Sequence, residues 1–217
     1  MDKFYFYKMT CDNGVAPCID NGIHSLAICK PVIRRAANEC DVILGFGGKK
    51  LGEKLIYVAK ISKIVVNGEY YNENETYSSR KDCIYRWEDD ELIFRDGSKF
   101  HDQSHRDHDV GIAKHHKYRA NVILANEFVY FGKDGTDEYK NIYSALKESI
   151  EGMRQGHRIN HSQVLIDELR GLYNNYIWKY GTQKIIGHPH HKPDNLSSCS
   201  ETEGKVRCVQ CSPRKTE

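Results

Sequence analysis

The stretch from Asp41 to Tyr70, DVILGFGGKKLGEKLIYVAKISKIVVNGEY, decides the fold that the sequence predicts. It opens with a short apolar run, Asp41 to Phe46, whose β-branched residues favour a strand. A basic glycine-rich loop follows, Gly47-Gly48-Lys49-Lys50-Leu51-Gly52, and then a second predicted strand over Leu55 to Val66. Asn67-Gly68 is a hairpin turn signal because both residues tolerate positive φ. The stretch therefore predicts two strands joined by a basic loop and followed by a tight turn.

The chain before this stretch predicts one strand and one short helix. Lys3 to Met9 alternates around aromatic residues, which favours an opening strand. Cys11 to Asn21 has the glycine and proline of a loop, and His24 to Cys29 is a short apolar segment. Pro31 to Asn38 is predicted to be a helix, because proline loses nothing at the first helical position.

Short strands and polar loops are predicted between the turn and Gly135. Tyr70 to Tyr77 is polar and rich in tyrosine, which indicates a loop. Cys83 to Trp87 and Glu91 to Arg95 are strand candidates, and Asp96 to Val110 is a long polar loop. Asn121 to Phe131 is a further predicted strand. Several short strands with polar connections favour a curved or closed sheet.

The pattern becomes helical after Gly135. Apolar residues recur at helical spacing over Asp137 to Met153 and again over Ser162 to Tyr180, with a polar break at Gln155 to Asn160. Gly187 to Glu217 has no core pattern and is predicted to be a tail. The predicted organisation is a barrel domain at 1–135, a helical hairpin packed on it at 136–181, and a polar tail at 182–217.

Composition excludes some classes of protein and leaves others open. The 217 residues carry 32 basic and 30 acidic side chains, so the net charge of +2 neither favours nor opposes nucleic acid as a partner. The mean hydropathy is −0.67, and no apolar run approaches the ~20 residues that a membrane span needs. The N-terminus lacks the apolar core of a signal peptide. We therefore expect a cytoplasmic protein whose 8 cysteines are thiols or metal ligands.

Four segments carry a resemblance to a known family. They are Tyr5-Phe6-Tyr7-Lys8, Ala27-Ile28-Cys29-Lys30-Pro31, Asp41-Val42-Ile43-Leu44-Gly45 and Asn121 to Gly132. They resemble the nucleotide modification associated domain family of phages and bacteria, within the PUA-like superfamily of EVE, YTH and ASCH domains. The resemblance covers roughly the first two thirds of the chain and supplies no catalytic residue. It implies an α+β protein with a small PUA-like β-barrel.

The resemblance also implies an association with modified nucleobases. The predicted function is recognition of a modified nucleobase or nucleotide, with a role in DNA modification or in conflict between phage and host. The alternative is an enzyme that modifies nucleotides or bases by means of the loop from His101 to Asp109. The expected partner is nucleic acid or a nucleotide with a modified base, and no membrane.

The basic glycine loop is the first candidate binding site. Its glycines let backbone N–H groups approach phosphate, and its two lysines add positive charge. It lacks the spacing of a Walker loop, and a solvated hairpin loop is the alternative. The candidate nucleotide-binding residues are Tyr7, Lys8, Lys30, Arg34, Gly47, Gly48, Lys49, Lys50, Trp87, His157 and Arg158.

Aromatic residues are the second candidate. A set of them could stack on a base, worth roughly 1–3 kcal/mol per base, or could simply pack the core. The set is Tyr5, Tyr7, Tyr57, Tyr70, Tyr71, Tyr77, Tyr85 and Trp87.

The histidine-rich loop is the candidate catalytic element. Its histidines and aspartates are suited to moving protons or to binding a divalent metal, although their spacing matches no established metal motif. The catalytic candidates are His101, His105, Asp107 and His108; the alternative is a solvated polar loop.

The tail supplies a candidate zinc half-site. Cys208 and Cys211 have CxxC spacing, and Cys199 is a plausible third ligand. The fourth ligand would be His188, His190 or His191, and a disordered tail is the alternative. The other cysteines lack paired spacing, and most of them are expected to be buried thiols.

Overall fold

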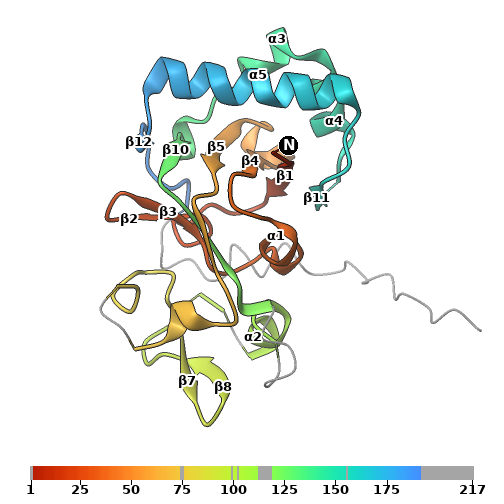
Figure 1. Ribbon diagram of the computed structural model, residues 1–217. Helices are drawn as coiled ribbons and strands as arrows, with labels where there is room; N and C mark the ends of the chain where they lie inside the picture. The colour runs from red at the N-terminus through yellow and green to blue at the C-terminus, as the bar shows by residue number, and fades with distance from the viewer. Residues whose placement is uncertain are drawn as a thin grey trace, which may run out of the picture.

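The structure is a computed structural model that describes residues 2–73, 76–98, 100–101, 103–111, 119–154 and 156–191 (Figure 1). The strands are β1 Phe4–Met9, β2 Cys18–Asp20, β3 Ile23–Leu26, β4 Val42–Gly47, β5 Leu55–Lys60, β6 Lys63–Val65, β7 Tyr85–Glu88, β8 Glu91–Phe94, β9 Val122–Ala125, β10 Glu127–Tyr130, β11 His157–Arg158 and β12 Lys184–Ile185. The α-helices are α1 Pro31–Ala36, α2 Gln103–Asp109, α3 Tyr139–Ile142, α4 Ser144–Gly152 and α5 Gln163–Tyr180. Short 3₁₀ helices are η1 Lys49–Leu51, η2 Glu69–Tyr71 and η4 Gly132–Asp134.

The strands form one large sheet and two smaller ones. The six-stranded sheet has the order β11-β1-β4-β5-β10-β12, the four-stranded sheet has the order β2-β3-β9-β6, and β7 pairs with β8. β1 and β4 are parallel, whereas β4, β5 and β10 are antiparallel. The protein is therefore of mixed α+β class, and no closed barrel is found within the residues that the structure describes.

Three hydrophobic cores follow one another through the molecule. The first lies between α3–α5 and the six-stranded sheet, where Phe6 and Leu44 meet Leu169 of α5. The second lies between the six-stranded and four-stranded sheets and includes Ile33 of α1. The third joins the four-stranded sheet to η2, β7 and β8. Figure 1 shows the same succession from α5 at the top to the β7–β8 hairpin at the bottom.

The central strands are apolar on both faces because both faces are covered. Along β1, Phe4 and Phe6 enter the first core, while Tyr5 and Tyr7 enter the second. Gly45 of β4 makes this packing possible, because an added Cβ would lie 2.3 Å from a ring carbon of Tyr57.

Both long predicted strands break where the chain passes between sheets. Residues 55–66 form β5 in the large sheet and then β6 in the four-stranded sheet, and residues 121–131 divide in the same way into β9 and β10. The change of sheet occurs at residues 61–62, where Ile61 N–H donates to Asp41 O and Ser62 N–H donates to Leu124 O. The prediction of single strands was wrong because an apolar run does not record which neighbour each half pairs with.

Asn67-Gly68 forms a turn but not a hairpin. Both residues have positive φ, 54° and 79°, as predicted. The chain then enters η2, and β6 pairs with β9, which is distant in sequence. Residues 70–77 are also not simply a polar loop, because Tyr70 and Tyr71 are buried.

Several other segments are more ordered than predicted. The polar segment 96–110 contains α2, the predicted helix over 137–153 is divided into α3 and α4 at Tyr143, and the break between the later helices contains β11. The segment after Gly181 adds β12 to the large sheet, and His191 N–H donates to Asp12 O. The pairing of β12 and the hydrogen bond of His191 join distant parts of the chain, so the local sequence does not indicate them.

Five predicted elements are confirmed within a few residues. β1 forms as predicted, and α1 begins at Pro31. β7 and β8 form a hairpin around Asp89 and Asp90, both with positive φ. α5 begins after Ser162, whose hydroxyl accepts a hydrogen bond from Leu165 N–H as an N-cap.

Candidate active site

A thiol, an imidazole and a carboxylate from separate segments meet near α1 and α2. Cys29 Sγ lies 3.6 Å from His101 Nε2, and His101 Nδ1 lies 3.5 Å from Asp109 Oδ2. The His101 side chain is 11% exposed and that of Asp109 is 3% exposed. The thiol therefore lies next to one nitrogen of a largely buried imidazole ring, and the carboxylate lies next to the other nitrogen.

A left-handed turn of the backbone places Cys29 at this point. Cys29 and Lys30 have φ of 60° and 49°, and Pro31 then opens α1. Non-glycine residues in this region cost roughly 1–2 kcal/mol each, and such strain is found at functional sites. The turn is held in part by Arg34, whose Nε donates to Cys29 O at 2.7 Å.

Arg34 is the centre of the polar network around the site. It is 0% exposed, and its guanidinium bonds Cys29 O, Arg119 O, Asn121 O, Asp109 O and Asp109 Oδ1 at 2.7–2.9 Å. One buried cation thus joins the turn at Cys29 to the end of α2. Because Arg34 takes Asp109 Oδ1, the other carboxylate oxygen faces His101; that oxygen, Oδ2, makes no hydrogen bond within the described residues.

The surroundings of His101 favour one tautomer. Its Nδ1 faces the Asp109 carboxylate and, at 3.2 Å, the Tyr85 hydroxyl. Burial and the charge of Asp109 raise the pKa of Tyr85, so this phenol stays protonated. With the proton on Nδ1, the lone pair of Nε2 points to the Cys29 thiol, which is the arrangement of a general base. The His105 ring stacks on His101 with centroids 5.2 Å apart.

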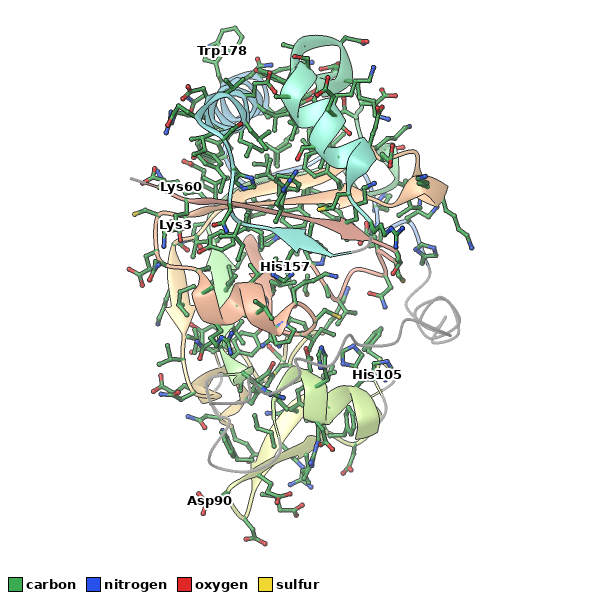
Figure 2. The ribbon with its side chains drawn as sticks, turned by 90° about the vertical axis from the view of Figure 1, so that its right-hand side faces the viewer. Lys3, Lys60, Asp90, His105, His157 and Trp178 are labelled. Atoms are coloured by element: carbon green, nitrogen blue, oxygen red, sulfur yellow. The ribbon has the colours of Figure 1, made fainter. Side chains whose placement is uncertain are left out.

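Lys30, Tyr7 and His157 form a second group near Cys29. Lys30 Nζ lies 5.1 Å from the centroid of the Tyr7 ring, and Tyr7 pairs with His157 between β1 and β11. Burial raises the pKa of Tyr7, with smaller contributions from Tyr57 and Cys29. Burial and the charge of Lys30 lower the pKa of His157. Figure 2 shows His157 on β11 and His105 on α2 on the same side of the molecule, with α1 between them.

Two of the four predicted catalytic residues lie in this site and two do not. His101 and His105 are in the cluster. The Asp107 carboxylate instead pairs with Arg106 at 2.7 Å, and His108 is exposed. The reason is that the segment is a helix rather than a loop, so neighbouring residues point to different sides.

The predicted nucleotide-binding residues are dispersed. Tyr7, Lys30, Arg34 and His157 border the Cys29 cluster, although Arg34 is buried and holds protein groups. The others are engaged elsewhere: Lys8 Nζ pairs with Glu53 at 2.6 Å, Arg158 donates to Ser149 Oγ at 2.6 Å, and Trp87 Nε1 donates to Gly68 O at 3.0 Å.

The basic glycine loop differs from the predicted phosphate cradle. Gly47 N–H donates to Lys54 O and Gly48 N–H donates to Met9 O, so these backbone donors are already used by the protein. Lys49 and Lys50 remain exposed on η1, at the tip of the β4–β5 hairpin. The lysines, not the glycines, are available to an external anion.

Most of the predicted stacking aromatics are in the cores. Six of them are at most 1% exposed: Tyr5, Tyr7, Tyr57, Tyr70, Tyr71 and Tyr85. Tyr77 is half-buried and stacks on Tyr70 with centroids 4.7 Å apart. These rings fill space between layers rather than face an external base.

A second buried polar network lies near the four-stranded sheet. Asp82 accepts hydrogen bonds from the Ser25 and Tyr70 hydroxyls and pairs with Arg80. His24 nearby is 0% exposed, and neither ring nitrogen has a hydrogen-bond partner within the described residues. Burial, with a contribution from the charge of Arg80, lowers the pKa of His24 to about 3.

Sequence reasoning missed Cys29 and gave Asp109 no catalytic role. Cys29 was grouped with the buried thiols because it has no paired cysteine spacing, yet it is half-buried beside His101. The local signal was Cys29-Lys30-Pro31, a cysteine at the turn into a helix. The partners lie more than 70 residues further along the chain, which no spacing rule covers.

The predicted zinc ligands Cys199, Cys208 and Cys211 lie outside the described residues. Within the described residues, no group of three or more His, Cys, Asp or Glu side chains is placed to hold a metal ion. The zinc site remains a prediction.

The fold and the site together define an α+β protein with a cysteine–histidine–aspartate cluster. The model of the family described as nucleotide modification associated domain 2 matches residues 1–193, and the chain belongs to this family. Neither a curated protein nor a solved structure matches the chain. No helix in the described part of the chain has the length and apolar character to cross a membrane.

Proposed function

We propose that this protein is an enzyme that acts on a nucleobase or nucleotide through Cys29 as nucleophile. The observation that carries the proposal is the alignment of Cys29 Sγ, His101 and Asp109 Oδ2. A cysteine is activated when an adjacent base takes its proton and a third group orients that base. Membership of a nucleotide modification associated family supports a nucleobase or nucleotide as the class of substrate.

Each residue of the cluster has a distinct role. His101 Nε2 takes the thiol proton, and the Asp109 carboxylate stabilises the imidazolium that results. Asp109 does not touch the substrate and is therefore a positioning residue, held by Arg34. We place the protein in the cytoplasm, where a nucleophilic thiol stays reduced.

The test compares two thiols within one chain. Iodoacetamide is added to the folded protein, and alkylation of Cys29 and of the exposed Cys40 is followed by peptide mass spectrometry. Although Cys29 is less exposed, we expect it to react roughly tenfold faster than Cys40, because His101 promotes the thiolate. Deoxynucleoside monophosphates should slow the reaction at Cys29 and leave Cys40 unaffected.

A His101→Ala variant should bring the Cys29 rate down without changing Cys40. Equal rates at the two thiols in the natural sequence, or no protection by any of the four monophosphates, would overturn the proposal.

Recognition of a modified base in nucleic acid is the second candidate function. It is favoured by the exposed pair Lys49 and Lys50, which adds two adjacent charges at a hairpin tip. A PUA-like barrel would suit this function. In its favour, two bent antiparallel strands, β5–β6 and β9–β10, pass from one sheet to the other around a shared core.

Binding of labelled oligonucleotides across a salt series tests this candidate. Lys49→Ala with Lys50→Ala should weaken binding and reduce the salt slope by about two charges. The control is Lys63→Ala with Lys147→Ala, which removes the same charge from exposed positions on β6 and α4. Equal losses in the two double variants would leave only a general charge effect and no binding at the hairpin tip.

A further inference from the structure

The arrangement of the thiol, imidazole and carboxylate restricts the kind of reaction that Cys29 can perform. His101 Nε2 is the base next to the sulfur, and its Nδ1 faces the buried Asp109 carboxylate at 3.5 Å and the Tyr85 hydroxyl at 3.2 Å. The nitrogen that takes the thiol proton is therefore also placed to give that proton to a leaving group on the carbon that the sulfur attacks. That exchange is what acyl transfer requires.

We propose that the site is an acyl-transfer centre whose substrate is a nucleoside or nucleotide bearing an amide- or ester-linked acyl group. The inference rests on the proposed function, because it assigns a reaction to the same nucleophile. It commits to the acyl carbonyl as the point of attack, rather than to a carbon of the base ring.

The chemistry is balanced without any oxidant or further cofactor. The thiol proton moves to His101 Nε2, the sulfur attacks the carbonyl carbon, and a C–S bond forms. The C–N or C–O bond to the nucleoside then breaks as His101 returns the proton to the departing nitrogen or oxygen. Water, or an amine acceptor, next gives a proton to His101 and attacks the thioester, and the C–S bond breaks to restore the thiol.

Lys30 supplies the charge that the intermediate needs. It follows Cys29 directly in the sequence, and its ammonium group is held 5.1 Å from the centroid of the Tyr7 ring. A cation beside the attacked carbonyl stabilises the negative oxygen of the tetrahedral intermediate. Lys30 also favours a substrate that carries a phosphate group.

The experiment uses p-nitrophenyl acetate as an acyl donor with the full chain. We expect a burst of p-nitrophenolate equal to the protein concentration and an acetyl group on Cys29, identified by peptide mass spectrometry. Neutral hydroxylamine should remove that group, because it cleaves thioesters and spares thioethers. Cys29→Ser should lose the burst, and Cys40→Ser should keep it.

Asp109→Asn separates a positioning role from a structural one. Without the carboxylate the imidazolium is less stable, so the pH midpoint of acylation should move to lower pH as the rate falls. A lower rate with an unchanged midpoint would contradict the role of Asp109. Tyr85→Phe keeps the buried ion pair between Arg34 and Asp109. It therefore provides a second variant if Asp109→Asn does not fold.

The outcomes distinguish this inference from the proposed function. If Cys29 is alkylated rapidly and protected by nucleotides but never carries an acetyl group, the acyl-transfer inference fails and the cysteine nucleophile stands. If Cys29 is neither alkylated faster than Cys40 nor acetylated, both fail.

Discussion

Arg34 shows how one residue connects the stability of this protein to its site. Its guanidinium is fully buried and donates to four backbone carbonyls, including that of Asp109, and to Asp109 Oδ1. Breaking a buried ion pair leaves the remaining charge without compensation, which costs more than the pair itself contributes. Sequence reasoning listed Arg34 among the candidate nucleotide-binding residues, whereas in the structure it is buried and bonded to protein groups.

Replacing Arg34 should therefore strongly destabilise the fold. For Arg34→Met, which keeps the length of the side chain, we expect a loss of about 3–5 kcal/mol in the free energy of unfolding, measured by urea denaturation. Arg35→Met on the exposed side of α1 is the matched control and should change it by less than about 0.5 kcal/mol. Similar losses in both variants would contradict the central role of Arg34.

His24 should make stability depend on pH. Its pKa falls from 6.5 when unfolded to about 3 in the folded protein, because the buried ring lies near Arg80 and against Tyr57. The unfolded chain therefore binds a proton more readily, so this contribution is complete above pH 6.5 and is lost as the pH falls towards 3. At pH 5 the loss is about 2 kcal/mol.

The variant His24→Phe keeps an aromatic ring between Tyr57 and Phe128 and removes the titrating group. The difference in unfolding free energy between pH 7 and pH 5 should shrink by about 2 kcal/mol relative to the natural sequence. His108→Ala, on an exposed side chain, serves as the control. An unchanged difference in His24→Phe would show that other groups set the acid sensitivity.

Close backbone contacts between elements decide the course of the chain after α5. Gly132 opens η4 with φ of 55°, and an added Cβ would lie 2.1 Å from His188 O. A Cβ added at Gly187 would likewise lie 2.2 Å from Phe131 O, and Lys133 N–H donates to His188 O. The segment 184–191, predicted in part as a tail, is thus packed against the end of β10.

Gly132→Ala should disturb this contact. The steric conflict and the positive φ together predict a loss of about 2 kcal/mol or more in the free energy of unfolding. Gly152→Ala at the end of α4 is the matched control, because no atom lies within 4 Å of its added Cβ. Thermal denaturation should show a lower melting temperature only for Gly132→Ala, and equal behaviour of the two variants would argue against the packing described.

At the scale of the whole molecule, the first core links the helices after residue 135 to the large sheet. Tyr139 and Leu169 share the first core with Phe46 of β4, and β11 joins the region between α4 and α5 to β1. The helices after residue 135 therefore bury one face of the large sheet.

The C-terminal cysteines carry the remaining proposal at this scale. We propose that Cys199, Cys208 and Cys211, which lie outside the described residues, bind zinc. The full chain, purified without chelator, should then contain about one zinc per chain, and Cys208→Ser should contain none. Elemental analysis measures the metal, and Cys40→Ser is the control. A full chain without zinc would remove the proposal.

The sequence by itself determined the elements whose signals are local. The strands β1, β7 and β8 follow from the residue pattern, and the helices α1 and α5 follow from Pro31 and from the helical spacing that begins at Ser162. Four short segments were also enough to indicate the family. Such signals act over a few residues, so they can be recognised in the sequence without knowledge of the elements that pack against them.

Only the tertiary structure decided the division of long strands between sheets, the burial of the tyrosines and the candidate active site. Cys29 and His101 are joined across 72 residues of sequence, and Arg34 reaches Asp109 across 75 residues, which fixes the geometry of the cluster. The physical reason is that a site of this kind depends on distances of 3–4 Å between atoms. Those distances arise only when separate layers pack and bury a common charge.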